Sequence, residues 1–234
     1  MIRFICLNAF IVVFTIIMCL WGLFLSLFNR SGRIIHFYTA VPWAKTILWI
    51  SGVKVRIQGL ENVETNAPRI YLSNHQSAFD ILGLIACFPV DFKFIVKKEL
   101  MRIPLFGDVL KRVGYISIDR SNPRRAMESM NEAAEKIKTG VSVLVFPEGT
   151  RSLDGSLLPL KKGGFHLALK SKCDVVPVAI INSSSIVPKG SLRIKKGAFS
   201  INIGKTVSIK DYPKKETGQL MEKVRKAILD QMKD

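Results

Sequence analysis

The chain has 234 residues and a formal net charge of +17 at pH 7, with 35 lysine and arginine residues against 18 aspartate and glutamate residues. Hydrophobic residues still make up 48% of it, so a disordered polar protein is excluded, and the length fits one domain with an appended segment. The cysteines and the three histidines show no C-x-x-C pair and no clustered spacing, which argues against a disulfide framework and against a metal site.

Residues 4–28 form an almost unbroken apolar segment, and Arg3 is the one charged side chain among the first 29 residues. A helix of this length reaches roughly 37 Å, which is enough to cross a bilayer. A cleaved signal peptide is the alternative, but the segment is longer than an ordinary signal core and does not end in a small-x-small cleavage site. We therefore expect a retained membrane segment, which either spans the bilayer or lies in one leaflet.

Residues 34–53 mix aromatic and aliphatic side chains, and Pro42 is expected to kink or to start a helix there. Two interpretations stay open: a helix in the headgroup layer, or packing of residues 47–53 on the domain core. Positive charge beside the apolar segment favours the cytoplasmic face of the membrane for the rest of the chain. We therefore expect membrane-anchoring helices in residues 1–52 and a separate α/β domain in residues 53–234.

From residue 53 onward, short β-branched runs alternate with helical patterns. Strands are expected at residues 53–58, 69–72, 92–96, 115–118, 141–146, 174–181 and 199–203. Helices are expected at residues 77–88 and 123–140, and an exposed amphipathic helix at 214–234. This alternation predicts an α/β fold with a mostly parallel central sheet flanked by helices.

The helix at residues 123–140 has the clearest signals. Asn122 is suited to cap its amino end, Pro123 to occupy its first position, and Gly140 to end it. The helical spacing predicts a buried stripe made of Met127, Met130, Ala134 and Ile137.

The stretch "SNHQSAFD" follows the strand at residues 69–72 and contains His75 and Asp80. With Asp80 in the first turn of the next helix, its carboxylate can hold Nδ1 of His75 and leave Nε2 free to accept a proton. This is the base and its orienting carboxylate without a protein nucleophile, so the nucleophile would be a substrate hydroxyl. The alternative is that Asp80 only complements the helix amino end and that His75 has a structural role.

The stretch "FPEGTRS" follows the strand at residues 141–146, so it should share a sheet edge with "SNHQSAFD". Pro147 and Gly149 bound a tight turn that presents Glu148, Thr150 and Arg151. This turn suits an anionic group, unless Glu148 and Arg151 merely pair on the surface. Arg120 follows the strand at residues 115–118 in the same way, and we expect the two arginines to follow neighbouring strands and to clamp one phosphate. Lys98 either joins that clamp or is a solvated charge.

Four motifs together carry a family resemblance: "NHQSAFD", "KKELMRIPLFG…ISIDR", "FPEGTRS" and "VVPVAI". Their order and approximate spacing resemble the four sequence blocks of the glycerolipid acyltransferases, in particular the bacterial-type 1-acyl-sn-glycerol-3-phosphate acyltransferases. The resemblance covers residues 53–181. Four ordered blocks are specific, whereas any one of them alone is not.

The resemblance implies a transferase of phospholipid biosynthesis at the cytoplasmic face of a bacterial inner membrane. His75, oriented by Asp80, would be the general base on the sn-2 hydroxyl of lysophosphatidic acid. The acyl donor would be acyl-CoA or acyl-carrier protein, the product phosphatidic acid, and no acyl-enzyme would form. Membrane lipids are the implied partners, with no nucleic acid, no metal and no cofactor beyond the co-substrate. The implied acceptor site holds phosphate and glycerol through Arg120, Glu148, Gly149, Arg151 and Lys98.

Alternative functions differ in how well they fit the motifs of the sequence. A nucleotide-binding loop in "GAFSINIGKT" fails on glycine spacing, and a hydrolase would need a G-x-S-x-G turn that the sequence lacks. A basic membrane-tethered protein that binds lipid or nucleic acid is compatible with the charge, but it leaves His75 and Asp80 unexplained. A sister acyltransferase that uses glycerol 3-phosphate or another lysophospholipid would carry the same motifs.

Overall fold

The computed structural model describes residues 1–234 apart from 30, 120, 211, 213–216 and 234. Its strands form one sheet in the order β1-β7-β6-β2-β5-β3-β4. In chain order they are β1 (Val53–Gln58), β2 (Ile70–Ser73), β3 (Phe92–Lys97), β4 (Ile116–Ile118), β5 (Ser142–Val145), β6 (Val175–Ile181) and β7 (Gly197–Ile203). All neighbours are parallel except β6 and β7. The predicted α/β fold with a mostly parallel sheet is confirmed.

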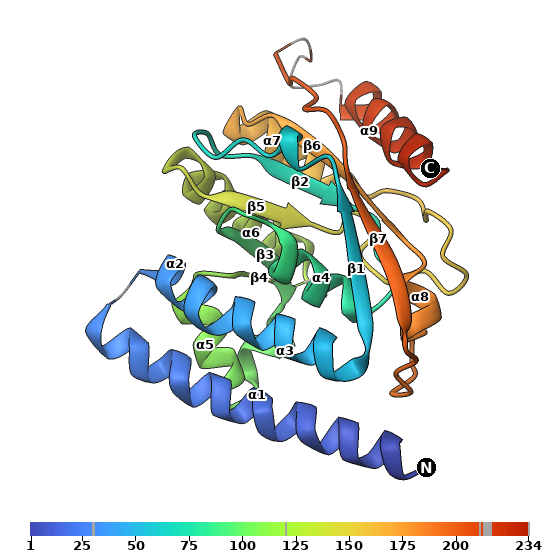
Figure 1. The fold of residues 1–234 in the computed structure, drawn as a ribbon. Coiled ribbons are helices and arrows are strands. Elements are labelled where there is room, and N and C mark those ends of the chain that lie inside the picture. Colours follow the sequence, from blue (N-terminus) through green and yellow to red (C-terminus); the bar gives the residue numbers. More distant parts are fainter. Residues whose placement is uncertain (30, 120, 211, 213–216, 234) are drawn as a thin grey trace.

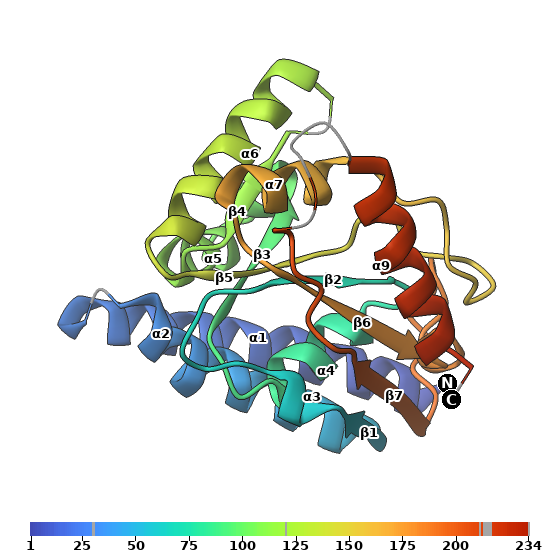
Figure 2. The ribbon, with the colours of Figure 1, turned by 90° about the horizontal axis from the view of Figure 1, so that it is seen from above.

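Helices cover both faces of the sheet (Figures 1 and 2). They are α1 (Ile2–Phe28), α2 (Gly32–Ile35), α3 (Val41–Ser51), α4 (Phe79–Cys87), α5 (Phe106–Val113), α6 (Pro123–Lys138), α7 (Gly163–Ser171), α8 (Ser183–Ile186) and α9 (Thr217–Gln231). A π-helical turn, His36–Ala40, joins α2 to α3, and 3-10 turns occupy Leu60–Asn62 and Lys98–Arg102. Helices α3 and α4 lie on one face with α1 outside them, and α6, α7 and α9 lie on the other.

The alternation of side chains along each strand builds one hydrophobic cluster on each face of the sheet. On β2, Tyr71 points into the cluster under α3 and α4, while Ile70 and Leu72 point into the cluster under α7 and α9. All three residues are completely buried. A strand that is apolar on both faces is typical of a parallel sheet covered by helices on both sides.

Helix α6 begins and ends as its sequence predicts. The Asn122 side chain accepts hydrogen bonds from the backbone N–H groups of Arg124 and Arg125, at 3.0 and 3.1 Å, and Gly140 has a φ of 95° just after the helix. The expected burial of Met127 is wrong, because its side chain is 58% exposed. Only the second half of α6 packs tightly, through Ala133, Ala134 and Ile137.

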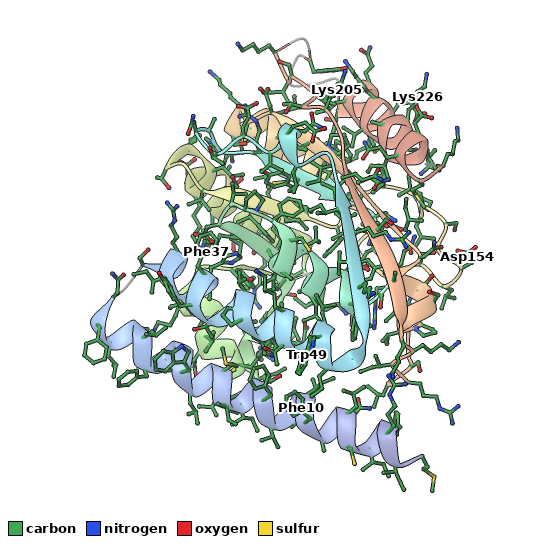
Figure 3. All side chains as sticks on the ribbon, in the orientation of Figure 1. Phe10, Phe37, Trp49, Asp154, Lys205 and Lys226 are labelled. Carbon is green, nitrogen blue, oxygen red and sulfur yellow. The ribbon has the colours of Figure 1, made fainter. Side chains whose placement is uncertain are left out.

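The C-terminal helix is less exposed than expected. Leu220, Val224 and Ile228 of α9 are completely buried, since this face of the helix packs on α7 and β6. The spacing of these residues, one helical turn apart, forms the apolar stripe that holds α9 on the sheet. Lys223 and Lys226 of α9 are exposed, and Figure 3 shows Lys226 on the outer side of the molecule.

Helix α1 docks on α3 at the point where Pro42 interrupts the backbone hydrogen bonds. Pro42 has no N–H to give to the carbonyl of Tyr38, and Trp21 Nε1 of α1 donates to that carbonyl instead, at 3.2 Å. Beside this bond, Gly22 leaves room for Thr39: a Cβ on Gly22 would lie 3.1 Å from the Thr39 methyl group. A proline and a glycine therefore fix how α1 and α3 meet.

One side of helix α3 packs on the domain core, as one of the two interpretations expects: Ile47 and Leu48 are buried against the sheet. On the other side Trp49 is 79% exposed, and a place for this side in the headgroup layer stays a prediction. Figure 3 shows Trp49 and Phe10 on the side of the molecule formed by α3 and α1. The helix ends at Ser51, and its buried residues share one hydrophobic cluster with the sheet.

Helix α1 is, in the described part of the chain, the one helix that is long and apolar enough to cross a membrane. It nevertheless lies along α3 and α5 for much of its length. Its outward side chains are exposed and apolar, namely Ile5, Val12, Val13, Ile16, Ile17, Leu20, Phe24, Leu27 and Phe28.

Candidate active site

Two polar loops meet at the carboxyl edge of the sheet, as the sequence predicts. The loop with His75 follows β2 and the loop with Glu148 follows β5, and these strands are parallel neighbours. The backbone N–H of His75 donates to Glu148 Oε1 at 2.6 Å, and the N–H of Ser152 donates to the His75 carbonyl at 2.8 Å. Both backbone groups of His75 are therefore held by the second loop.

Asn74 holds the same loop on its other side. Its side-chain Nδ2 donates to the carbonyl of Ile180 on β6 at 2.8 Å, and its Oδ1 accepts from the Ile180 N–H at 2.6 Å. Asn74 is completely buried. This pair of bonds continues the pairing of β2 with β6 beyond the last backbone contact, so His75 leaves the sheet from a fixed position.

His75 and Asp80 form a hydrogen-bonded pair, with 2.8 Å between Nδ1 and Oδ2. Asp80 is completely buried in the first turn of α4. Its Oδ2 also accepts from the backbone N–H groups of Gln76 and Ser77, at 2.7 and 2.8 Å. Asp80 thus complements the helix amino end and orients His75 at the same time. No other described residue makes a hydrogen bond to Nε2 of His75, so this atom remains available to a substrate.

Phe146 covers one face of the His75 ring, a contact that the sequence analysis missed. The two ring centroids are 4.0 Å apart and the planes are inclined by 14°. Phe94 of β3 stacks behind Phe146 at 6.0 Å, which connects the histidine to the aromatic core. The only signal for this contact in the sequence is the position of Phe146 at the end of a strand, directly before Pro147.

Glu148 lies inside the protein rather than on the surface, with 2% of its area exposed. Its Oε1 accepts from His75 N, and its Oε2 accepts from the N–H of Leu158 at 2.9 Å. Burial raises the pKa of Glu148 to about 7, although both backbone bonds act to lower it. The described residues include no ion pair between Glu148 and Arg151, so the surface-pair alternative is wrong.

Gly149 follows with a φ of 72°. This is the left-handed region, where a side chain would be strained. A Cβ there would also lie 2.9 Å from the Lys161 ammonium nitrogen. The turn after β5 therefore depends on glycine at this position. This turn places the N–H of Ser152 where it donates to the His75 carbonyl.

The basic residues of the expected phosphate clamp lie at several points of the edge. Lys98 Nζ contacts Asp119 Oδ2 at 2.9 Å, and hydrogen bonds from Ser121 and Lys98 hold the pKa of the Asp119 carboxyl well below its usual range. Arg151 is half-buried, and its carbonyl accepts from Lys189 Nζ at 3.0 Å. Arg120 lies outside the described residues.

The expectation that Arg120 and Arg151 follow neighbouring strands is wrong. Arg151 follows β5 and Arg120 follows β4, and β3 lies between these two strands. Adjacent strands are roughly 5 Å apart, so the two strand ends are separated by roughly 10 Å. Strands β4 and β5 are consecutive in the chain but are not neighbours in the sheet, whereas the expectation required them to be neighbours.

Two hollows lie among the elements around this edge, and His75 itself lines neither of them. A groove of about 460 Å³ lies between the helices and the segment after α8, and it is lined by Arg151, Phe79 of α4, Ile11 of α1 and Trp43 of α3, among others. A narrow cavity of about 110 Å³ lies deeper, between α1, the π-helical turn, α5 and the sheet, and no charged side chain of the described chain lines it. Phe94 forms part of its wall and also stacks on Phe146. The edge therefore combines a histidine–aspartate pair, a largely apolar groove with Arg151 on its wall, and an apolar cavity. Its described residues include no group of carboxylates, histidines or cysteines that could hold a metal ion.

The chain is similar in sequence to known proteins. Residues 54–181 match the family model described as "Acyltransferase". The chain is 38% identical over 181 residues to the chloroplastic 1-acyl-sn-glycerol-3-phosphate acyltransferase BAT2 of Brassica napus, covering 77% of this chain and 52% of that protein. It is 36% identical over 186 residues to the 1-acyl-sn-glycerol-3-phosphate acyltransferase of Saccharomyces cerevisiae, covering 78% and 61%.

A solved structure extends the likeness to the whole chain. The crystal structure of the 1-acyl-sn-glycerophosphate (LPA) acyltransferase PlsC from Thermotoga maritima is similar with a TM-score of 0.86 and 27% identity, covering 99% of this chain and 94% of that one. The match to BAT2, by contrast, spans about half of that protein's length. The family model covers more than half of the chain and includes the loops with His75 and Glu148, and the chain belongs to the acyltransferase family.

Proposed function

We propose that the protein transfers an acyl chain from a thioester donor to the sn-2 hydroxyl of lysophosphatidic acid and so forms phosphatidic acid. The observation that carries the proposal is the pair of His75 and Asp80, with Nδ1 bonded to the carboxylate and Nε2 without a partner among the described residues. The names of relatives such as those from Brassica napus and Saccharomyces cerevisiae support the acceptor and the type of reaction.

In the proposed step, Nε2 of His75 takes the proton of the acceptor hydroxyl while the oxygen attacks the thioester carbonyl. The tetrahedral intermediate then expels the thiolate, which takes the proton back from the imidazolium, so the products are the ester and a free thiol. Asp80 stabilises the imidazolium that forms in between and keeps the ring in the required tautomer. No protein nucleophile takes part, and no acyl-enzyme forms.

The acyl chain of the donor is assigned to the narrow apolar cavity. Its walls are hydrocarbon and aromatic, with no charged side chain in the described part of the chain, which suits a fatty acyl chain and disfavours a polar group. The stack of Phe94, Phe146 and His75 runs from this cavity to the base. The thioester would therefore lie near the histidine when the chain fills the cavity, with CoA or a carrier protein remaining outside.

The phosphate of the acceptor is assigned to Arg151, the one charged residue among those described that lines the groove. Arg151 lines it beside Phe79 and Trp43, and the planar guanidinium is suited to a two-pronged contact with phosphate. Arg120 and Lys98 stay part of the proposed clamp, with Lys98 paired to Asp119 until the substrate binds. The apolar wall supplied by α1 and α3 is suited to the acyl chain that lysophosphatidic acid already carries.

The membrane part of the proposal concerns the orientation of α1. One side of the helix packs along α3 and α5, and the other side is apolar and exposed. If α1 crossed the bilayer, the polar domain attached along it would enter the hydrocarbon, at a large free-energy cost. We therefore place α1 along one leaflet, with the groove open toward the lipid and the domain in the cytoplasm.

An acyl-transfer assay tests the function directly. The full chain is offered lysophosphatidic acid or glycerol 3-phosphate, each with acyl-CoA and with acyl-carrier protein as donors. We expect phosphatidic acid from lysophosphatidic acid, and loss of the product in His75→Ala. Turnover of glycerol 3-phosphate alone would instead establish the sister acyltransferase, and a radiolabelled acyl-enzyme would contradict direct transfer.

A further inference from the structure

A second hollow, of about 710 Å³, lies at the amino end of α1, where the helix faces the segment after α8. Arg3, Arg193 and Lys195 line it together with the apolar side chains of Phe4, Leu7 and Ile194. Among the described residues no carboxylate lines it. The hollow is therefore cationic on one part of its wall and apolar on the other.

Two hydrogen bonds hold the segments that line the hollow in fixed positions relative to one another. Arg3 donates from Nη2 to the Ser51 carbonyl at the end of α3, at 3.2 Å, and Asn8 donates from Nδ2 to the Leu192 carbonyl, at 3.3 Å. Arg193 and Lys195 are exposed, and within the described chain neither has an ion-pair partner. Their charges are thus free to bind an anion from outside.

The position of the hollow on the molecule suggests where such an anion comes from. The exposed apolar side of α1 runs up to it, with Ile5 58% exposed, and Leu192 beside it is 69% exposed. With this surface in the hydrocarbon of one leaflet, the cations of the hollow lie at the depth of the phosphate groups. A ligand with an acyl part for Phe4 and Leu7 and an anionic head for Arg193 and Lys195 fits both walls.

We propose that this hollow binds the headgroup phosphate of an anionic membrane phospholipid, at a site separate from the acceptor groove. The inference rests on the proposed orientation of α1 in the membrane, and it adds a defined lipid site to a general surface attraction. Such a lipid would link α1 to the segment 191–196, and it would hold the domain at a set tilt over the bilayer.

The test measures lipid binding to the full chain in detergent micelles, without substrates. Phosphatidylglycerol or the zwitterionic phosphatidylcholine is titrated, and native mass spectrometry gives the fraction of protein that carries lipid. We expect the wild type to prefer phosphatidylglycerol about tenfold. In Arg193→Gln/Lys195→Gln the dissociation constant for phosphatidylglycerol should rise about 30-fold, since each cation near a lipid surface contributes about one factor of five.

The control is Lys205→Gln/Lys226→Gln, which removes the same charge at the opposite end of the molecule, beside α9 (Figure 3). Both lysines are exposed, and we expect a change of less than about threefold. Equal losses in both double variants would mean attraction by net charge only and would overturn the site. Displacement of the lipid by millimolar inorganic phosphate would also overturn it, because a free-anion site would then explain the binding.

The result does not depend on catalysis. Circular dichroism of both double variants checks that they fold, and the acyl-transfer assay runs separately on the wild type. If the wild type transfers acyl groups but shows no preference for phosphatidylglycerol, the lipid site is wrong and the proposed function stands. If it binds phosphatidylglycerol selectively but transfers no acyl group to any acceptor, the proposed function is wrong and the lipid site stands.

Discussion

At the polar edge of the sheet, buried carboxylates accept hydrogen bonds from backbone N–H groups, whereas α1 meets the rest of the chain mainly through apolar contacts. Glu148 and Asp80 each bind two backbone groups of the catalytic loops. Side-chain hydrogen bonds between α1 and the rest of the chain, such as that from Trp21 to the Tyr38 carbonyl, are isolated and surrounded by apolar contacts. The proposed proton transfer requires atoms held within tenths of an ångström, whereas the proposed contact of α1 with fluid lipid does not, and the two kinds of packing match this difference.

The first way to break the rigid region is to remove the base. His75→Ala and Asp80→Asn should each lower kcat by about 10²–10⁴-fold, because the first lacks the proton acceptor and the second no longer orients it. Steady-state kinetics of folded variants measures this effect. The control is His166→Ala, a change at an exposed histidine of α7, which should leave kcat unchanged. Near-normal turnover in His75→Ala would refute the assigned base.

A second change tests the groove between the two regions. Arg151→Ala should raise the KM for lysophosphatidic acid by roughly 10- to 100-fold, since a charge-assisted hydrogen bond to phosphate contributes about 1.5–3 kcal/mol. The KM for the acyl donor should change little, and this serves as the internal control. Arg120→Ala is expected to act in the same direction. Equal increases for donor and acceptor would argue against a phosphate contact.

A third change sharpens the question of what holds His75 in place. Phe146→Leu removes the ring that stacks on the imidazole at 4.0 Å, and we expect kcat to fall by up to about tenfold with both KM values nearly constant. Phe146→Tyr should restore kcat. Phe92→Leu is the matched control, because Phe92 is completely buried in the same aromatic cluster and does not stack on His75. If both leucine variants lose kcat equally, the effect is one of stability.

The smallest effect at neutral pH is a change in the free energy of unfolding at His36, which lies between the helical layer and the sheet. Its ring is completely buried, and among the described residues neither nitrogen has a hydrogen-bond partner. Burial lowers the pKa of His36 to about 4, with Asp91 acting to raise it and Lys93 to lower it further. Stability from the neutral ring is complete above pH 6.5 and is lost as pH falls toward 4, by roughly 3 kcal/mol in all.

Glu148 has the opposite sign, because its pKa is raised to about 7. Its contribution is lost as pH rises from 4.5 to 7 and is regained on acidification. Between pH 4.5 and 6.5 the pH dependences that His36 and Glu148 give to the free energy of unfolding therefore partly cancel in the wild type.

His36→Phe should be more stable than the wild type by about 2 kcal/mol at pH 5 and should differ little at pH 7. Denaturant unfolding at both pH values measures this, and equal differences at the two would exclude His36 as the titrating group.

The sequence predicted the strands well, since each is a short run of buried, β-branched residues. It also predicted that the loops with His75 and Glu148 share an edge, because this follows from parallel strands alone. It did not predict α5, which begins after Leu105 at a φ of 62°. A Cβ on Gly107 would lie 2.3 Å from the Met101 carbonyl, so the start of this short helix depends on close packing against the 3-10 turn before it.

The position of Phe146 and the direction of β7 were missed for a related reason. Whether the side chain of Phe146, directly after β5, contacts His75 depends on the register between β2 and β5. No local sequence pattern encodes that register. Strand β7 runs antiparallel to β6, and the segment between them contains the short helix α8 rather than a long crossover helix of the kind that usually joins parallel strands. Roles that depend on pairs of distant strands thus required the structure.

The docking of α1 on α5 has a consequence for how the protein is made. Helix α1 ends at Phe28 and α5 begins at Phe106, so a ribosome adding ~5–20 residues per second synthesises the second helix roughly 4–16 seconds after the first. During that interval α1 has no α5 surface to cover its apolar side. The growing chain would therefore associate with lipid before the domain folds, and the domain would assemble already attached to the leaflet it serves.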